Sequence, residues 1–91
     1  MTNERLTDKR ALVRIVDDDE DLLQALAFML KSEGWEVKTY NGSASFLAED
    51  DISIPGCVIL DYSMPDLDGL ETQKRLQELN YPHPVSYTHL R

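Results

Sequence analysis

The chain contains little that would place it outside a reducing compartment or inside a membrane. Among its 91 residues there is a single cysteine, Cys57, which cannot form an internal disulfide and is typical of a reducing cytoplasm. No apolar run approaches the length of a membrane span, and residues 1–10 are polar and lack the apolar core of a signal peptide. The sequence therefore favours a cytoplasmic protein with no membrane partner.

Basic residues are also scarce. There are 9 lysines and arginines against 17 acids, which gives a formal net charge of −8. Direct binding to a nucleic-acid backbone requires a basic surface, so we expect no DNA-binding residues here. There are no internal repeats, and a chain of this length with 42% hydrophobic residues supports at most one small domain.

The most informative features of the sequence are two short apolar segments that each end in acids. Residues 11–16 lead into Asp17, Asp18 and Asp19, and residues 57–60 lead into Asp61. Each segment reads as a buried strand of a parallel sheet. Parallel strands end at one edge of the sheet, where open α/β folds place their ligand crevice. Clustered carboxylates repel one another unless a hard cation such as Mg²⁺ lies among them, so the pattern predicts a metal site around Asp61.

The acids at residues 17–21 form a run of five, which in isolation is also typical of a disordered tail. Apolar sequence flanks this run on both sides, and we therefore interpret it as part of a site. Asp19 is a candidate N-cap, while Glu20 and Asp21 suit the first turn of a helix and its dipole.

The remaining elements follow from periodicity. Apolar residues recur at helical spacing after Asp19, and Gly34 is a plausible helix stop. Residues 35–40 alternate, which predicts an edge strand with Trp35, Val37 and Thr39 on its buried side and Tyr40 on its polar side. A turn at 41–43 precedes a short helix, residues 70–79 form another that ends at Asn80, and residues 81–84 are extended before and between prolines. The predicted order is β-α-β-α-β-α, a doubly wound parallel sheet of the α/β class.

The acidic pair Asp17-Asp18, the strand ending at Asp61, and the following Met64-Pro65 and Asp68-Gly69 together resemble the receiver domain of two-component response regulators, closest to the FixJ-like class. The resemblance covers residues 11–85 and implies a flavodoxin-like receiver fold after a loose lead-in at residues 1–10.

The resemblance assigns roles to individual residues. It implies that Asp61 accepts a phosphoryl group from a partner sensor histidine kinase. It also implies that Mg²⁺ is bound by Asp17, Asp18, Asp61 and the backbone carbonyl of Ser63. Four residues would shape the following loop, because proline fixes φ and glycine permits a tight turn: Met64, Pro65, Asp68 and Gly69. The module would regulate an output domain in cis, a helix-turn-helix DNA-binding domain absent from this sequence, and would not be a free-standing enzyme.

The pattern departs from the family after Val85. The family continues with an apolar strand that ends in Ser or Thr, and later with a strand that ends in Lys. Residues 86–91 instead read as a sequence foreign to the domain, and Thr88 falls about one residue early for the hydroxyl position. We therefore expect a receiver that is incomplete at its C-terminus, with an exposed sheet edge.

Two alternatives belong to other functional classes. An aspartyl-phosphate hydrolase also places a nucleophilic Asp after a buried strand, but it requires an Asp-x-Asp motif where this chain has Asp61-Tyr62-Ser63. A pseudo-receiver that binds a partner without being phosphorylated is disfavoured by the presence of all three aspartates and favoured by the missing Lys.

Overall fold

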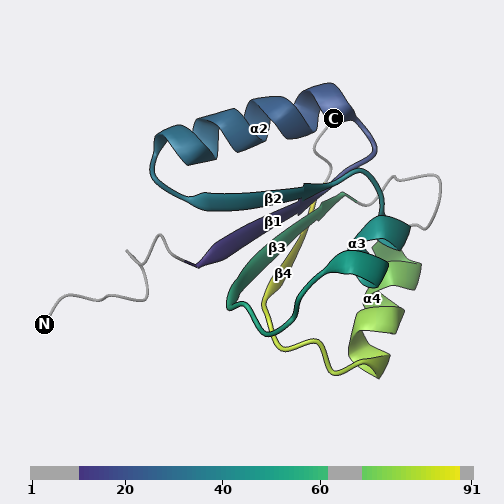
Figure 1. Ribbon diagram of the computed structural model, residues 1–91. Helices are drawn as coiled ribbons and strands as arrows, with labels where there is room; N and C mark the ends of the chain where they lie inside the picture. The colour runs from purple at the N-terminus through teal and green to yellow at the C-terminus, as the bar shows by residue number, and fades with distance from the viewer. Residues whose placement is uncertain (1–10, 62–68, 89–91) are drawn as a thin grey trace, which may run out of the picture.

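The computed structural model describes residues 11–61 and 69–88, which form one parallel sheet and three helices (Figure 1). The strands are β1 (Leu12–Val16), β2 (Glu36–Tyr40), β3 (Gly56–Asp61) and β4 (Val85–Thr88), and the helices are α2 (Glu20–Ser32), α3 (Ser43–Glu49) and α4 (Gly69–Glu78). The strand order is β2-β1-β3-β4, and every neighbouring pair is parallel. This is the predicted doubly wound α/β architecture.

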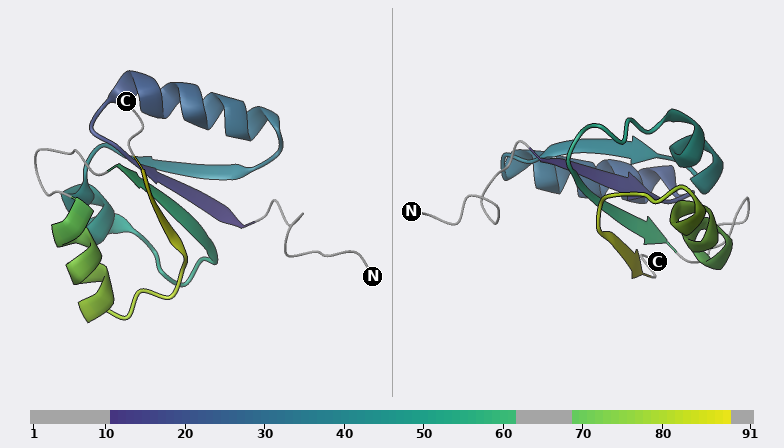
Figure 2. Two further views of the ribbon diagram at one scale, coloured as in Figure 1. Left: turned by 180° about the vertical axis from the view of Figure 1, so that it is seen from behind. Right: turned by 90° about the horizontal axis from the view of Figure 1, so that it is seen from below.

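Helices cover both faces of the sheet (Figure 2). On the face under α2, Val13 and Ile15 of β1 pack with Leu23. On the opposite face, Val16 and Leu60 pack with Phe46 of α3 and Leu76 of α4. Successive side chains of a strand point to opposite faces, so a single β1 sequence serves two cores. This two-sided burial explains why the strands read as nearly continuous apolar runs.

The ends of α2 lie where the sequence predicts them. The Asp19 carboxylate accepts a hydrogen bond from the Leu22 N–H at 3.2 Å, as an N-cap does. At the other end Gly34 has a φ of 96°, a left-handed conformation that glycine adopts without steric cost. Helix α4 ends similarly at Asn80, whose φ is 54°.

The close approach of β1 and β3 explains one further glycine. A Cβ atom added to Gly56 would lie 1.8 Å from the carbonyl oxygen of Leu12, its register partner in β1. The Leu12 N–H also donates to the carbonyl of Pro55 at 2.9 Å. The start of β3 is therefore fixed against the start of β1, which in turn fixes the register of the two strands at their far ends.

Two features of the sheet differ from the sequence-based expectation. Tyr40 is buried and Thr39 is exposed, the reverse of the predicted faces at that end of β2. The Tyr40 ring packs edge-to-face on Phe46, with centroids 5.4 Å apart, and this contact draws it into the core. The sheet also has a fourth strand, β4, which includes Ser86 and Tyr87 from the segment that we expected to be foreign to the domain.

Strand β4 forms because β3 offers it a complete pairing edge. Val58 pairs with Val85 and Asp61 with Thr88, and the Val58 N–H donates to the carbonyl of Pro84 at 2.9 Å. Val85 and Tyr87 also pack against the core under α4, so an alternating strand is stabilised on one face. Within residues 11–61 and 69–88, no helix is both long enough and apolar enough to cross a bilayer.

Candidate functional site

Asp61 and Asp17 lie side by side at the carboxyl edge of the sheet. Asp61 is the last residue of β3, and Asp17 directly follows β1, the neighbouring parallel strand. The register pairs Val16 with Leu60, so the two aspartates occupy equivalent positions one residue further along. Asp17 is 0% exposed and Asp61 is 1% exposed, although both are ionisable. Carboxylates are rarely buried to this extent without a charge partner or a function.

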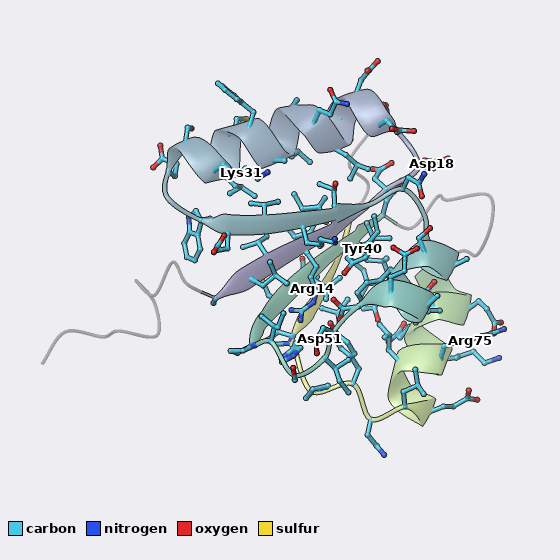
Figure 3. The ribbon with its side chains drawn as sticks, viewed as in Figure 1. Arg14, Asp18, Lys31, Tyr40, Asp51 and Arg75 are labelled. Atoms are coloured by element: carbon cyan, nitrogen blue, oxygen red, sulfur yellow. The ribbon has the colours of Figure 1, made fainter. Side chains whose placement is uncertain are left out.

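Asp18 completes a cluster of three carboxylates. One oxygen of each of Asp17, Asp18 and Asp61 lies within 4.8 Å of the others. Three oxygen donors at this spacing fit a hard divalent cation, because Mg²⁺ prefers oxygen ligands and retains water at its other positions. Asp18 is half-buried and lies where β1 gives way to α2, so this corner of the cluster faces the outside (Figure 3). The donor set is therefore suitable for Mg²⁺.

Backbone hydrogen bonds fix Asp17 in this arrangement. Its N–H donates to the carbonyl of Tyr40 at 3.1 Å, which ties the end of β1 to the end of β2. One of its carboxylate oxygens, Oδ1, accepts the Asp19 N–H at 2.9 Å. The chain turns sharply here, and Asp18 and Asp17 both remain at the sheet edge while α2 begins.

The other acids of the run at residues 17–21 are not in the cluster. Asp19 caps α2, and Glu20 and Asp21 are exposed in its first turn, as predicted. Ser63, Met64, Pro65 and Asp68 lie outside the described residues, and their predicted roles remain predictions. Gly69 is the first residue of α4. Thr88 ends β4 as the register partner of Asp61, and its side chain is outside the described part of the structure.

Sequence reasoning missed a second buried ionic group, which lies on the face of the sheet covered by α3 and α4 (Figure 3). Arg14 of β1 is 0% exposed, and its Nε donates to Asp50 Oδ1 at 2.5 Å. Its Nη2 donates to the carbonyls of Asp51 and Ile54 at 2.9 and 2.6 Å. A lone arginine within an otherwise apolar strand was the available signal in the sequence, because burial of such a charge requires an acidic partner.

Two tyrosine hydroxyls complete this group. Tyr40 donates to Asp50 Oδ1 at 3.1 Å, and Tyr81 donates to Asp50 Oδ2 at 2.8 Å. Burial, together with the hydrogen bond to the Asp50 carboxylate, raises the pKa of Tyr40 to about 12. The same two causes, burial first, raise the pKa of Tyr81. We call Arg14, Asp50, Tyr40 and Tyr81 the Asp50 cluster.

Cys57 lies apart from both groups. It is half-buried and packs against the apolar cluster under α2. Burial raises the pKa of its thiol, which lowers the fraction of reactive thiolate. Both observations favour a packing role for Cys57.

Comparison with known families decides which family the chain belongs to. The family described as the response regulator receiver domain matches residues 13–88 of the chain. The chain belongs to the response regulator receiver family. The match runs through β4 to Thr88 and includes all three clustered aspartates.

Individual relatives support the assignment. The response regulator protein TmoT of Ectopseudomonas mendocina is 34% identical over 84 residues, which is 92% of this chain and 38% of the relative. The transcriptional regulatory protein FixJ of Azorhizobium caulinodans is 39% identical over 67 residues, covering 70% of this chain and 30% of that protein. The chain thus spans about a third of the length of such relatives.

Solved structures give the same result. The crystal structure of FixJ-N is similar with a TM-score of 0.78 and 35% identity, over 85% of this chain and 62% of that one. The response regulator StyR matches with a TM-score of 0.80 and 32% identity, over 86% of this chain and 39% of StyR. The described fold ends after β4, so as a receiver it is incomplete at its C-terminal part, as the sequence predicts.

Proposed function

We propose that the chain is the phosphoacceptor part of a response regulator, phosphorylated on Asp61 with the help of Mg²⁺. The observation that carries this proposal is the cluster of Asp17, Asp18 and Asp61 at the carboxyl edge of the sheet. The predicted Ser63 carbonyl would add a fourth oxygen ligand. Asp61 ends a rigid central strand, whereas Asp18 lies at the more accessible corner of the cluster.

The chemistry needs few participants. A carboxylate oxygen of Asp61 attacks the phosphorus atom, an oxygen–phosphorus bond forms, and the bond between phosphorus and the donor breaks. When bound, Mg²⁺ would supply positive charge to the phosphoryl oxygens and to the carboxylates around them. Asp17 and Asp18 would hold the ion beside Asp61. The hydrogen bonds from the Asp17 N–H to the Tyr40 carbonyl and from the Asp19 N–H to the Asp17 carboxylate keep Asp17 in place.

The partners follow from the same proposal. A sensor histidine kinase would donate the phosphoryl group, and the receiver would act as a regulatory module and not as a free-standing enzyme. The names of FixJ and TmoT describe a transcriptional regulatory protein and a response regulator. We therefore propose a cytoplasmic regulator of transcription, with a helix-turn-helix output domain that this sequence does not include.

The experiment incubates the chain with Mg²⁺ and acetyl phosphate, a small phosphoryl donor, and measures the intact mass. We expect the addition of one phosphoryl group, lost in Asp61→Asn and abolished by chelation of Mg²⁺. Asp21→Asn is the matched control, because Asp21 is an exposed carboxylate in α2 outside the cluster. It should be phosphorylated like the wild type.

A second measurement on the same sample distinguishes a phosphoacceptor from a pseudo-receiver. Beryllofluoride with Mg²⁺ mimics an aspartyl phosphate, so the amide NMR signals of Asp17 and Asp61 should shift on its addition. A folded chain that gains no phosphoryl group and shows no shift would rule out the phosphoacceptor function and leave a partner-binding module.

A further inference from the structure

Two buried hydroxyl groups join α3 and α4, the two helices on the face of the sheet where Val16 and Leu60 lie. Thr72 Oγ1 in α4 donates to Ser43 Oγ in α3 over 2.9 Å, and both residues are 0% exposed. Helices α3 and α4 lie next to each other on the same face of the sheet (Figures 1 and 2). Neither hydroxyl is needed to fill this part of the core, because apolar side chains of similar size would occupy the same space and would need no hydrogen-bond partner.

The pair lies between segments that lead to the phosphoacceptor site. Ser43 begins α3, three residues after Tyr40, whose carbonyl holds the backbone of Asp17. Thr72 lies in the first turn of α4, the helix that follows Asp61 along the chain. The hydrogen bond therefore connects the β2–α3 junction, which fixes Asp17, to the start of the helix that comes after Asp61.

The nearby apolar contacts fix the relative position of α3 and α4 less well than the Ser43–Thr72 hydrogen bond does. Phe46 lies one turn beyond Ser43, Leu76 lies one turn beyond Thr72, and both belong to one core cluster. Apolar contacts have no directional requirement and tolerate small shifts. Helix α3 has only 7 residues and no side-chain N-cap, so its position depends on tertiary contacts. A directional hydrogen bond between buried hydroxyls fixes the alignment of the two helix starts.

We propose that the Ser43–Thr72 pair positions the phosphoacceptor site by fixing the start of α4 relative to the junction that holds Asp17. The inference rests on the proposed function of Asp61. Ser43 and Thr72 are positioning residues, because they act through the backbone around the carboxylate cluster and are not among its ligands.

The decisive variant is the double substitution Ser43→Ala with Thr72→Val. Each single substitution leaves the other hydroxyl buried with a lost partner, which lowers stability. The double variant removes both hydroxyls together, so it should lose less stability than the sum of the two single losses. If the pair positions the site, Mg²⁺ affinity should remain about 3- to 10-fold weaker in the double variant, the factor that corresponds to one lost hydrogen bond.

Two further variants serve as controls. Thr72→Ser keeps the hydroxyl and should bind Mg²⁺ within about 2-fold of the wild type, a difference smaller than one hydrogen bond. Ser45→Ala removes a different hydroxyl of α3. The Ser45 hydroxyl donates to Asn41 Oδ1 at 3.2 Å, and this hydrogen bond is exposed to solvent. It should leave both stability and Mg²⁺ affinity unchanged.

The measurements are chemical denaturation and Mg²⁺ titration followed by the amide signals of Asp17 and Asp61. A stable double variant that binds Mg²⁺ as tightly as the wild type would overturn the inference and leave the proposed function standing. A wild-type chain whose signals do not respond to Mg²⁺ would overturn both. Weakened affinity in the double variant, with Thr72→Ser normal, supports the positioning role.

Discussion

Two buried groups in this small domain contain carboxylates, and they are built differently. On the face of the sheet covered by α3 and α4, the Asp50 carboxylate receives hydrogen bonds from Arg14 and from two tyrosine hydroxyls. At the carboxyl edge, Asp17, Asp18 and Asp61 bring three carboxylates within 4.8 Å of one another. The first group contains its own cation, whereas the second has the composition of a site that receives one.

The difference shows how one fold can bury charge for two purposes. The Asp50 cluster joins β1, the end of α3 and the segment before β4 through partners that the chain itself supplies. Its charge is compensated within the protein, so loss of either partner would leave an uncompensated buried charge. The carboxyl-edge cluster concentrates like charge, which costs stability until a cation binds. Its stability should therefore depend on the solution, and this dependence allows the comparison to be tested.

The largest effect is expected from Arg14→Met. Removal of the guanidinium leaves the Asp50 carboxylate buried without its cation, which should lower the free energy of unfolding by about 3–5 kcal/mol. Chemical denaturation measures the change. Arg75→Met is the matched control, because Arg75 is exposed and its pairing with Glu71 spans 3.6 Å, so it should change stability by less than about 1 kcal/mol. Equal effects at the two arginines would contradict a structural role for the Asp50 cluster.

The next effect is stabilisation by Mg²⁺. At a free concentration 100 times the dissociation constant, the cation should raise the free energy of unfolding by about 2.7 kcal/mol, because it binds only the folded chain. Thermal denaturation with Mg²⁺ and after chelation measures the gain. Asp61→Asn should lose most of it. Asp21→Asn, whose exposed carboxylate lies outside the cluster, should keep it, and a loss in that variant would contradict a site built on the three clustered aspartates.

A smaller stabilisation is expected when the carboxyl-edge cluster loses one charge in the absence of the cation. Asp18→Asn in Mg²⁺-free buffer should raise the free energy of unfolding by about 0.5–2 kcal/mol, since it relieves repulsion at a functional site. Asp50→Asn should instead lower it, because Arg14 then loses its charged partner. If both substitutions destabilise the chain, the two groups do not differ as proposed.

The smallest effect is confined to alkaline solution. The pKa of Tyr40 rises from 10.0 to about 12 in the folded chain, so unfolded Tyr40 loses its proton first as the pH increases. The stability that this hydroxyl contributes is fully present below pH 10 and is lost as the pH rises from 10 toward 12. Denaturation across this pH window measures the loss of stability. In the folded chain, the tyrosinate absorbance of Tyr40 should appear at a higher pH than that of an exposed tyrosine. Tyr40→Phe should show a shallower decline, and an identical decline would argue against the hydroxyl–Asp50 bond.

Features that depend on neighbouring residues in the chain could be predicted from the sequence. Asp19 and Gly34 mark the ends of α2 through local backbone geometry, and the structure confirms both. The approach of Asp17 to Asp61 could also be predicted, because two apolar strands that end in acids place them at one edge of a parallel sheet. The fold class and the family follow from these patterns.

Features that depend on distant partners were missed. Arg14 is buried because Asp50 and the carbonyls before β3 surround it, and nothing near Arg14 in the sequence indicates them. Tyr40 was assigned to the wrong face because the alternating pattern does not include its ring contact with Phe46 or its hydrogen bond to Asp50. Strand β4 has polar residues at Ser86 and Thr88, and it forms because β3 presents an open edge. The Ser43–Thr72 bond likewise depends on the way in which two helices meet.

The strand order also governs how the domain can form during synthesis. β1 is made first, yet it lies in the middle of the sheet between β2 and β3. Leu12 finds its partner on one side in Glu36 and on the other only when Gly56 has been made. The four described strands pair only in parallel, so each of their pairings joins residues distant in the sequence, and such topologies fold slowly. A ribosome takes seconds to add the intervening residues. During that time Val13 and Ile15 lack their partners, and the apolar strand that later carries Asp17 to its place is an exposed segment of the kind that aggregates.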